Sequence, residues 1–80
     1  MKYLKFNVNI KQDRSKLVSF YLKEDNLYLG EIFWSRIKRQ YILAISRDIG
    51  LISQWNTKII SELEEYMRNL NREALEVKYV

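Results

Sequence analysis

The chain lacks cysteine, histidine and proline altogether, and its 80 residues include only two glycines. Without cysteine there is neither a disulfide framework nor a thiolate metal site, and without histidine the commonest general base and transition-metal ligand are both missing. The serines therefore have no histidine to activate them, and Gly30 and Gly50 stand alone rather than in a phosphate-binding loop. These absences argue against an enzyme, and we expect no catalytic residue, no cofactor and no metal site.

Long apolar runs are also missing. No stretch approaches the roughly 18 apolar residues of a membrane span, and the N-terminal "MKYLKFNVNI" alternates with polar residues instead of forming the apolar core of a signal peptide. With 48% hydrophobic residues, a chain of this length supports one core and not two. We therefore expect a single domain over residues 1–80 of a soluble cytoplasmic protein that does not engage the membrane.

Positive charge is present, and it is unevenly placed. Residues 1–52 carry ten Lys or Arg against five Asp or Glu, a balance of +5, whereas residues 53–80 carry four against five, a balance of −1. Such asymmetry favours an anionic partner for the first part of the chain, the alternative being an ordinary solvated surface.

Apolar residues alternate with period two near the N-terminus, as is typical of half-buried strands. The pattern runs from Leu4 to Ile10 and again from Val18 to Leu22, with polar turns "KQDRSK" and "KEDN" after the two runs. Residues 30–46, "GEIFWSRIKRQYILAIS", fit two further strands with "KRQ" at the tip between them. A helix through residues 28–49 is the alternative, but it would scatter the apolar residues from Ile42 to Ile49 around its whole circumference.

The period changes to 3.6 residues from Ser53 onward, which predicts an amphipathic helix. Ser53 or Asn56 can cap its first turn. Its apolar face comprises Trp55, Ile59, Ile60, Leu63, Tyr66, Met67 and Leu70. The tail "EALEVKYV" either extends the helix through Ala74 and Leu75 or ends in a short strand. The sequence thus predicts an α+β fold, ββββα: a four-stranded antiparallel meander at about 3–11, 17–23, 28–36 and 41–47, then a helix at about 53–72.

One helix can cover only one face of such a sheet, so the other face carries the candidate binding residues. On the first two strands that face is expected to show Tyr3, Lys5, Asn7, Asn9, Lys11, Tyr21 and Lys23. Phe33 is expected to join it, with basic side chains at the rim. Cations neutralise phosphates and aromatic rings stack on unpaired bases. The predicted site residues are Lys5, Tyr21, Lys23, Phe33, Arg36, Lys38 and Arg39.

This layout resembles the Whirly, Pur-alpha and transcriptional positive-cofactor group of single-stranded-DNA-binding proteins. In residues, "ISRDIGLISQW" followed by "NTKIISELEEY" is similar to that group's passage from last strand to helix, where a tryptophan opens the helix as Trp55 does here. As architecture the resemblance covers residues 3–72. It implies dimerisation and nucleic-acid binding on the strand side.

Two functions follow as hypotheses. The first is non-catalytic binding of single-stranded nucleic acid on the basic, aromatic sheet surface. The second is a regulator or inhibitor, encoded by a virus or mobile element, that docks the same surface on an acidic or nucleic-acid-binding protein. We also expect a homodimer, because a single helix leaves apolar side chains such as Ile42 and Ala44 uncovered.

Overall fold

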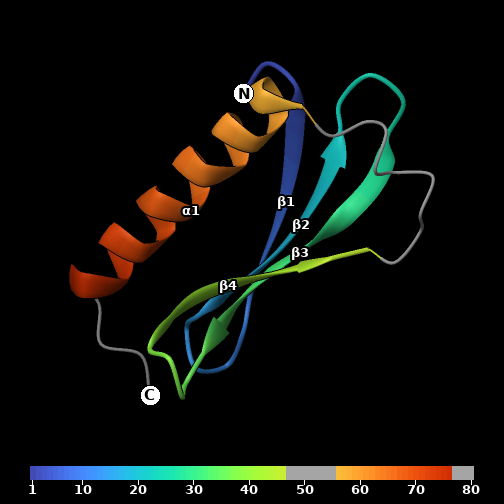
Figure 1. Ribbon diagram of the computed structural model, residues 1–80. Helices are drawn as coiled ribbons and strands as arrows, with labels where there is room; N and C mark the ends of the chain where they lie inside the picture. Colours follow the sequence, from blue (N-terminus) through green and yellow to red (C-terminus); the bar gives the residue numbers. More distant parts are fainter. Residues whose placement is uncertain (47–55, 77–80) are drawn as a thin grey trace.

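The computed structural model describes residues 1–46 and 56–76. Its elements are β1 (Leu4–Ile10), β2 (Lys16–Leu22), β3 (Leu27–Ser35), β4 (Gln40–Ile45) and α1 (Thr57–Glu76). The strands form one antiparallel sheet in the order β1-β2-β3-β4, and α1 lies along one side of it (Figure 1). The expected α+β fold, ββββα, is confirmed, and each strand boundary lies within two residues of its predicted position.

Residues 30–46 belong to a hairpin and not to a helix. β3 and β4 pair from Gly30 opposite Ile45 to Ser35 opposite Gln40. The turn between them closes without glycine because Arg39 takes a left-handed backbone with φ 54°, and the Arg39 N–H donates to the Ser35 carbonyl at 2.7 Å. The β2–β3 turn uses the expected polar residues: Asp25 accepts a hydrogen bond from the Leu27 N–H, and Asn26 has φ 58°.

The helix begins at Thr57 and is capped by Asn56, whose side-chain oxygen accepts hydrogen bonds from the N–H groups of Lys58 and Ile59 at 3.0 Å. The alternative cap, Ser53, and the predicted core residue Trp55 lie outside the described residues. The helix runs on through Ala74 and Leu75 to Glu76, beyond the predicted end near 72. A short final strand would fall on residues 77–80, which are also outside the described part.

The core lies between α1 and one face of the sheet. Phe20, Val18 and Ile32 from the central strands are completely buried, as are Leu4, Leu29 and Tyr41 to within 2%. From the helix, Ile59, Leu63 and Leu70 are buried and Tyr66 is half-buried, its ring stacked on Phe6 with centroids 3.7 Å apart. Ile60 was expected in the core, but it is 50% exposed because it lines an open groove between α1 and β4.

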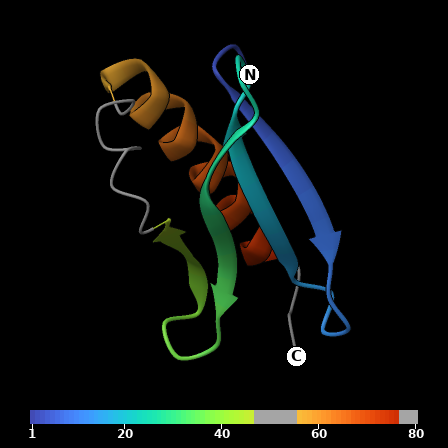
Figure 2. The same ribbon diagram turned by 90° about the vertical axis from the view of Figure 1, so that its right-hand side faces the viewer.

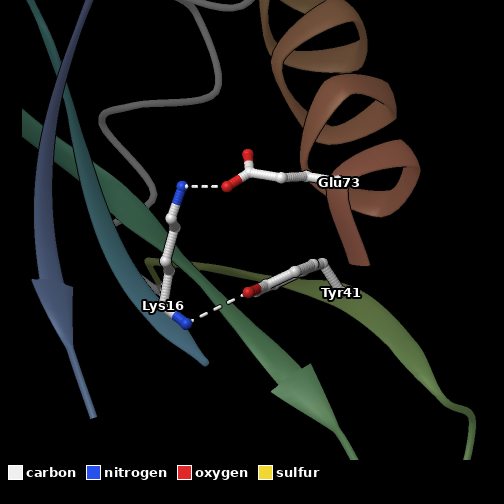
Figure 3. A network of polar contacts seen from close by, with 3 residues as sticks. All are labelled: Lys16, Tyr41 and Glu73. Atoms are coloured by element: carbon white, nitrogen blue, oxygen red, sulfur yellow. Dashed lines mark hydrogen bonds and ion pairs between the residues drawn. The ribbon is translucent and has the colours of Figure 1, made fainter. Parts of the chain in front are cut away.

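Polar contacts tie α1 to three strands. The Glu62 carboxylate accepts hydrogen bonds from the N–H groups of Tyr3 and Leu4 at the start of β1. Near the other end of the helix, Lys16 pairs with Glu73 at 2.7 Å, and its backbone N–H donates to the Tyr41 hydroxyl at 3.0 Å (Figure 3). The Asn71 side chain accepts from the Tyr41 N–H. These contacts fix α1 on one face of the sheet, so α1 does not cover the opposite face.

Candidate nucleic-acid interface

The side of the sheet turned away from α1 is here called the far face. Figure 2 looks onto it, with α1 behind the strands. Alternation along the strands assigns to it a set of mostly polar and aromatic side chains: Lys5, Asn7, Asn9, Leu17, Ser19, Tyr21, Tyr28, Glu31, Phe33, Ile42 and Ala44. No helix or strand among residues 1–46 and 56–76 covers this face.

A β-bulge shapes one end of the far face. Phe20 pairs with Gly30 but the next residue, Tyr21, pairs with Tyr28, so β3 contains one extra residue, Leu29. The extra residue turns into the core, where Leu29 is 1% exposed. Tyr28 is thereby placed directly opposite Tyr21 on the far face.

The two tyrosines and a lysine form the tyrosine end of the far face. The rings of Tyr21 and Tyr28 meet edge to face with centroids 5.5 Å apart. The Lys5 ammonium lies 5.9 Å from the centre of the Tyr21 ring and donates to the Asn26 side chain at 3.1 Å. The Tyr28 hydroxyl donates to Glu31 at 2.8 Å. The polar groups of the tyrosine end therefore already have partners within the protein.

The opposite end of the far face is apolar. Phe33 pairs with Ile42 on β4, and the register of Val18 with Ile32 sets Leu17 of β2 on its other side. Leu17, Phe33 and Ile42 are all half-buried. The ring of Phe33 is thus partly accessible. It lies about 13 Å along the strand direction from the tyrosine end, since Tyr21 is four residue steps from Leu17 along β2.

Beyond Phe33 the sheet ends in two hairpin turns that carry five exposed cations. The β1–β2 turn contributes Lys11 and Arg14, and the β3–β4 turn contributes Arg36, Lys38 and Arg39. The two turns lie at the same end of the sheet, the lower end in Figure 1. These five side chains are here called the basic end.

Asp13 joins the two turns of the basic end. One of its carboxylate oxygens accepts hydrogen bonds from the N–H and hydroxyl of Ser15, which is buried, and the other lies 3.9 Å from the Arg36 guanidinium. The two Ser15 hydrogen bonds, with smaller contributions from Arg36 and Lys11, hold the pKa of Asp13 below its usual value of 3.8. Asp13 is therefore ionised at neutral pH and offsets one of the five cations.

The predicted site residues lie at three places along the sheet. Lys5 and Tyr21 belong to the tyrosine end. Lys23 is added to it here because it follows β2 at the same end of the sheet, and its ammonium donates to the Met1 carbonyl at 3.2 Å. Phe33 belongs to the apolar end, and Arg36, Lys38 and Arg39 lie beyond it in the basic end.

The expectation that Tyr3 lies on the far face is wrong. Tyr3 precedes β1, and Glu62 of the helix binds its N–H. Its side chain packs against the core instead.

Sequence reasoning did not select Tyr28, Arg14 or Lys11 as site residues. Tyr28 was hidden by the bulge, because strict alternation cannot place both Tyr28 and Phe33 on the same face of β3. The lone Gly30 in a strand pattern was the available signal. Tyr28 is also electrostatically distinctive: burial, together with the hydrogen bond to Glu31, raises its pKa from 10.0 to about 12.

Comparison with known proteins adds no relative: no protein-family model, no curated protein and no solved structure matches this chain. The resemblance to the Whirly, Pur-alpha and positive-cofactor group therefore stays a prediction. In the described part of the chain, no helix has the length and hydropathy needed to cross a bilayer, and no three carboxylates converge as metal ligands.

Proposed function

We propose that this chain binds single-stranded nucleic acid without catalysis, through the far face and the basic end. One observation carries the proposal: the partly accessible ring of Phe33 lies beside a concentration of exposed cations, on a face that no described element covers. Cations at the edge of an aromatic strand surface suit a flexible polyanion whose unpaired bases can stack.

The chemistry divides between the parts of the surface. Arg36, Lys38 and Arg39 supply charge for phosphates, and Phe33 supplies a face on which a base can stack, worth about 1–3 kcal/mol. Tyr21 supplies a second ring about 13 Å away along the strands. Glu31 lies between Phe33 and Tyr21 and repels phosphate. The sugar-phosphate backbone of the nucleic acid is therefore expected to pass along the edges of the far face, with its bases pointing inward.

A protein partner is the second candidate, and a specific observation favours it. The row Leu17, Phe33 and Ile42 is apolar, and Tyr21 and Tyr28 are side chains in which protein interfaces are enriched. Such a partner would be acidic or itself a nucleic-acid-binding protein. A second copy of the chain on this face, as in the expected homodimer, would compete with nucleic acid for Phe33.

The test is titration of a fluorescently labelled oligothymidylate at several salt concentrations. Binding should weaken with a log-log slope of about −0.7 per phosphate contact, because each contact releases condensed counterion. Replacing Lys38 and Arg39 together by alanine should reduce the magnitude of the slope by about 1 to 1.5.

A ring-removing variant gives the complementary result. Phe33→Leu keeps an apolar side chain but abolishes stacking, so affinity should fall about 5- to 150-fold with little change in slope. Tyr21→Leu should behave in the same way. No measurable binding of the unmodified protein at low salt would reject the nucleic-acid function and leave the protein partner as the function to pursue.

A further inference from the structure

We propose that the basic end is a single phosphate-binding clamp built from both hairpin turns, with Arg14 and Arg39 as its principal contacts and Asp13 as an internal competitor. The inference rests on the proposed function and narrows it. It assigns phosphate contacts to Arg14 and Lys11 in place of Lys5 and Lys23. It also assigns to Asp13 the role of competing with phosphate.

The lysines of the tyrosine end are poor candidates because both ammonium groups already have partners. Lys5 contacts Asn26 and the Tyr21 ring, and Lys23 contacts the Met1 carbonyl. By contrast, the side chains of Arg14, Lys38 and Arg39 make no hydrogen bond or ion pair with any residue of the described ranges. Their charge is available to an anion without breaking an internal contact.

The two turns lie close enough to form one site, as the approach of Asp13 to Arg36 shows. The Asp13 carboxylate anchors the β1–β2 turn through buried Ser15 and reaches Arg36 of the β3–β4 turn at 3.9 Å. A phosphate placed between the turns would meet Lys11 and Arg14 from one side and the other three cations from the other. It would also compete with Asp13 for Arg36, so the carboxylate must lower the affinity of the site.

Backbone conformation singles out the two arginines. Arg14 has φ 71° and Arg39 has φ 54°, the left-handed region that glycine and asparagine adopt at least cost. The turn at the opposite end of the sheet does use asparagine, Asn26, in this conformation. Arg14 and Arg39 therefore carry a conformational cost at these positions. Bidentate hydrogen bonds from their guanidinium groups to phosphate would offset that cost.

The experiment separates binding from folding. In Arg14→Asn/Arg39→Asn, asparagine suits the left-handed backbone, so the thermal midpoint should stay unchanged or rise. Against labelled oligothymidylate the salt slope should shrink by about 1.4, two contacts' worth, and affinity at low salt should fall. Asp13→Asn keeps a side-chain oxygen for the Ser15 hydrogen bonds but frees Arg36, so its affinity should rise.

The control is Lys58→Gln, which removes one exposed cation where the clamp variant removes two. Lys58 belongs to the start of α1, which lies at the upper end in Figure 1, away from both turns. Lys58→Gln should leave affinity and slope close to those of the unmodified protein. If the asparagine pair melts lower than expected, Lys11→Gln/Lys38→Gln, outside the left-handed positions, takes its place, and its slope should also shrink but by less than 1.4.

The outcomes distinguish the two proposals. An unmodified protein that binds the oligonucleotide, while a folded clamp variant keeps the same affinity and slope, overturns the clamp and leaves the proposed function intact. An Asp13→Asn variant that binds more weakly also overturns the clamp. An unmodified protein that fails to bind at low salt overturns both.

Discussion

Replacing Gly30 by alanine should test how closely the backbones of β3 and β4 must pack next to the bulge. A Cβ at this position would lie 2.2 Å from the carbonyl oxygen of Ala44 and 3.1 Å from the Cα of Ile45, both on β4. The obstructing atoms belong to backbone, so no side chain can rotate away. Gly30 also has φ 159°, a backbone conformation that residues with a side chain rarely adopt.

The magnitude follows from these two effects. The Cβ and the Ala44 oxygen must separate by about 0.8 Å to reach 3.0 Å, the shortest approach that real Cβ atoms show, and this displaces β4 from β3. Forced overpacking costs about 1–3 kcal/mol, and a strained backbone conformation adds about 1–3 kcal/mol. We expect a loss of about 3 kcal/mol from a total stability of about 4–12 kcal/mol for a domain of this size.

Thermal unfolding followed by circular dichroism measures the effect. A loss of about 3 kcal/mol should lower the midpoint by roughly 12–24 °C. Ser19→Ala, on the far face of β2, is the control and should change stability by no more than about 0.5 kcal/mol. A Gly30→Ala midpoint within about 4 °C of the unmodified protein would show that β4 can move away at little cost and that the reasoning about the close approach of β3 and β4 is wrong.

Three further substitutions test individual contacts. Tyr41→Phe removes the hydroxyl that accepts from the Lys16 N–H and should cost about 1–2 kcal/mol in urea unfolding; an unchanged midpoint would contradict this. The lowered pKa of Asp13 gives stability that is present above pH 3.8 and is lost as the pH falls through its folded-state pKa. In Asp13→Asn the free energy of unfolding should therefore fall less steeply with decreasing pH than in the unmodified protein. Equal slopes below pH 3.8 for the two proteins would refute the lowered pKa of Asp13. Because Tyr28 has its pKa raised from 10.0 to about 12, stability should fall as the pH rises across that interval; Tyr28→Phe should remove this loss, together with the highest tyrosinate transition in ultraviolet absorbance.

Much of the fold was predictable because periodicity reports burial directly. The alternation from Leu4 to Ile10 and the 3.6-residue spacing from Ile59 to Leu70 both predicted elements that are present. In β1 only Leu4 and Phe6 meet the core, whereas Val8 and Ile10 are 42% and 65% exposed. The β3–β4 hairpin was predicted for the same reason, although its turn has no glycine. What the pattern could not supply was the conformation of Arg39, which substitutes for the glycine that such a turn usually contains.

The candidate site was predicted less completely than the fold. Alternation placed Lys5, Tyr21 and Phe33 on the correct face, but it assumes that every strand keeps an unbroken register. The extra residue Leu29 breaks that register, and Tyr28 changes sides as a result. The convergence of two hairpin turns depends on the pairing of β2 with β3, which no local pattern reports.

The contacts of α1 have a consequence for how the molecule assembles. Glu62 binds the backbone of Tyr3 across 59 positions of sequence, and Glu73 binds Lys16 across 57. A meander of neighbouring hairpins forms from local contacts, but its apolar face can be buried only when the last element docks against the first. During synthesis, Phe6 and Phe20 therefore stay exposed to water until the helix has emerged from the ribosome and can dock on the sheet.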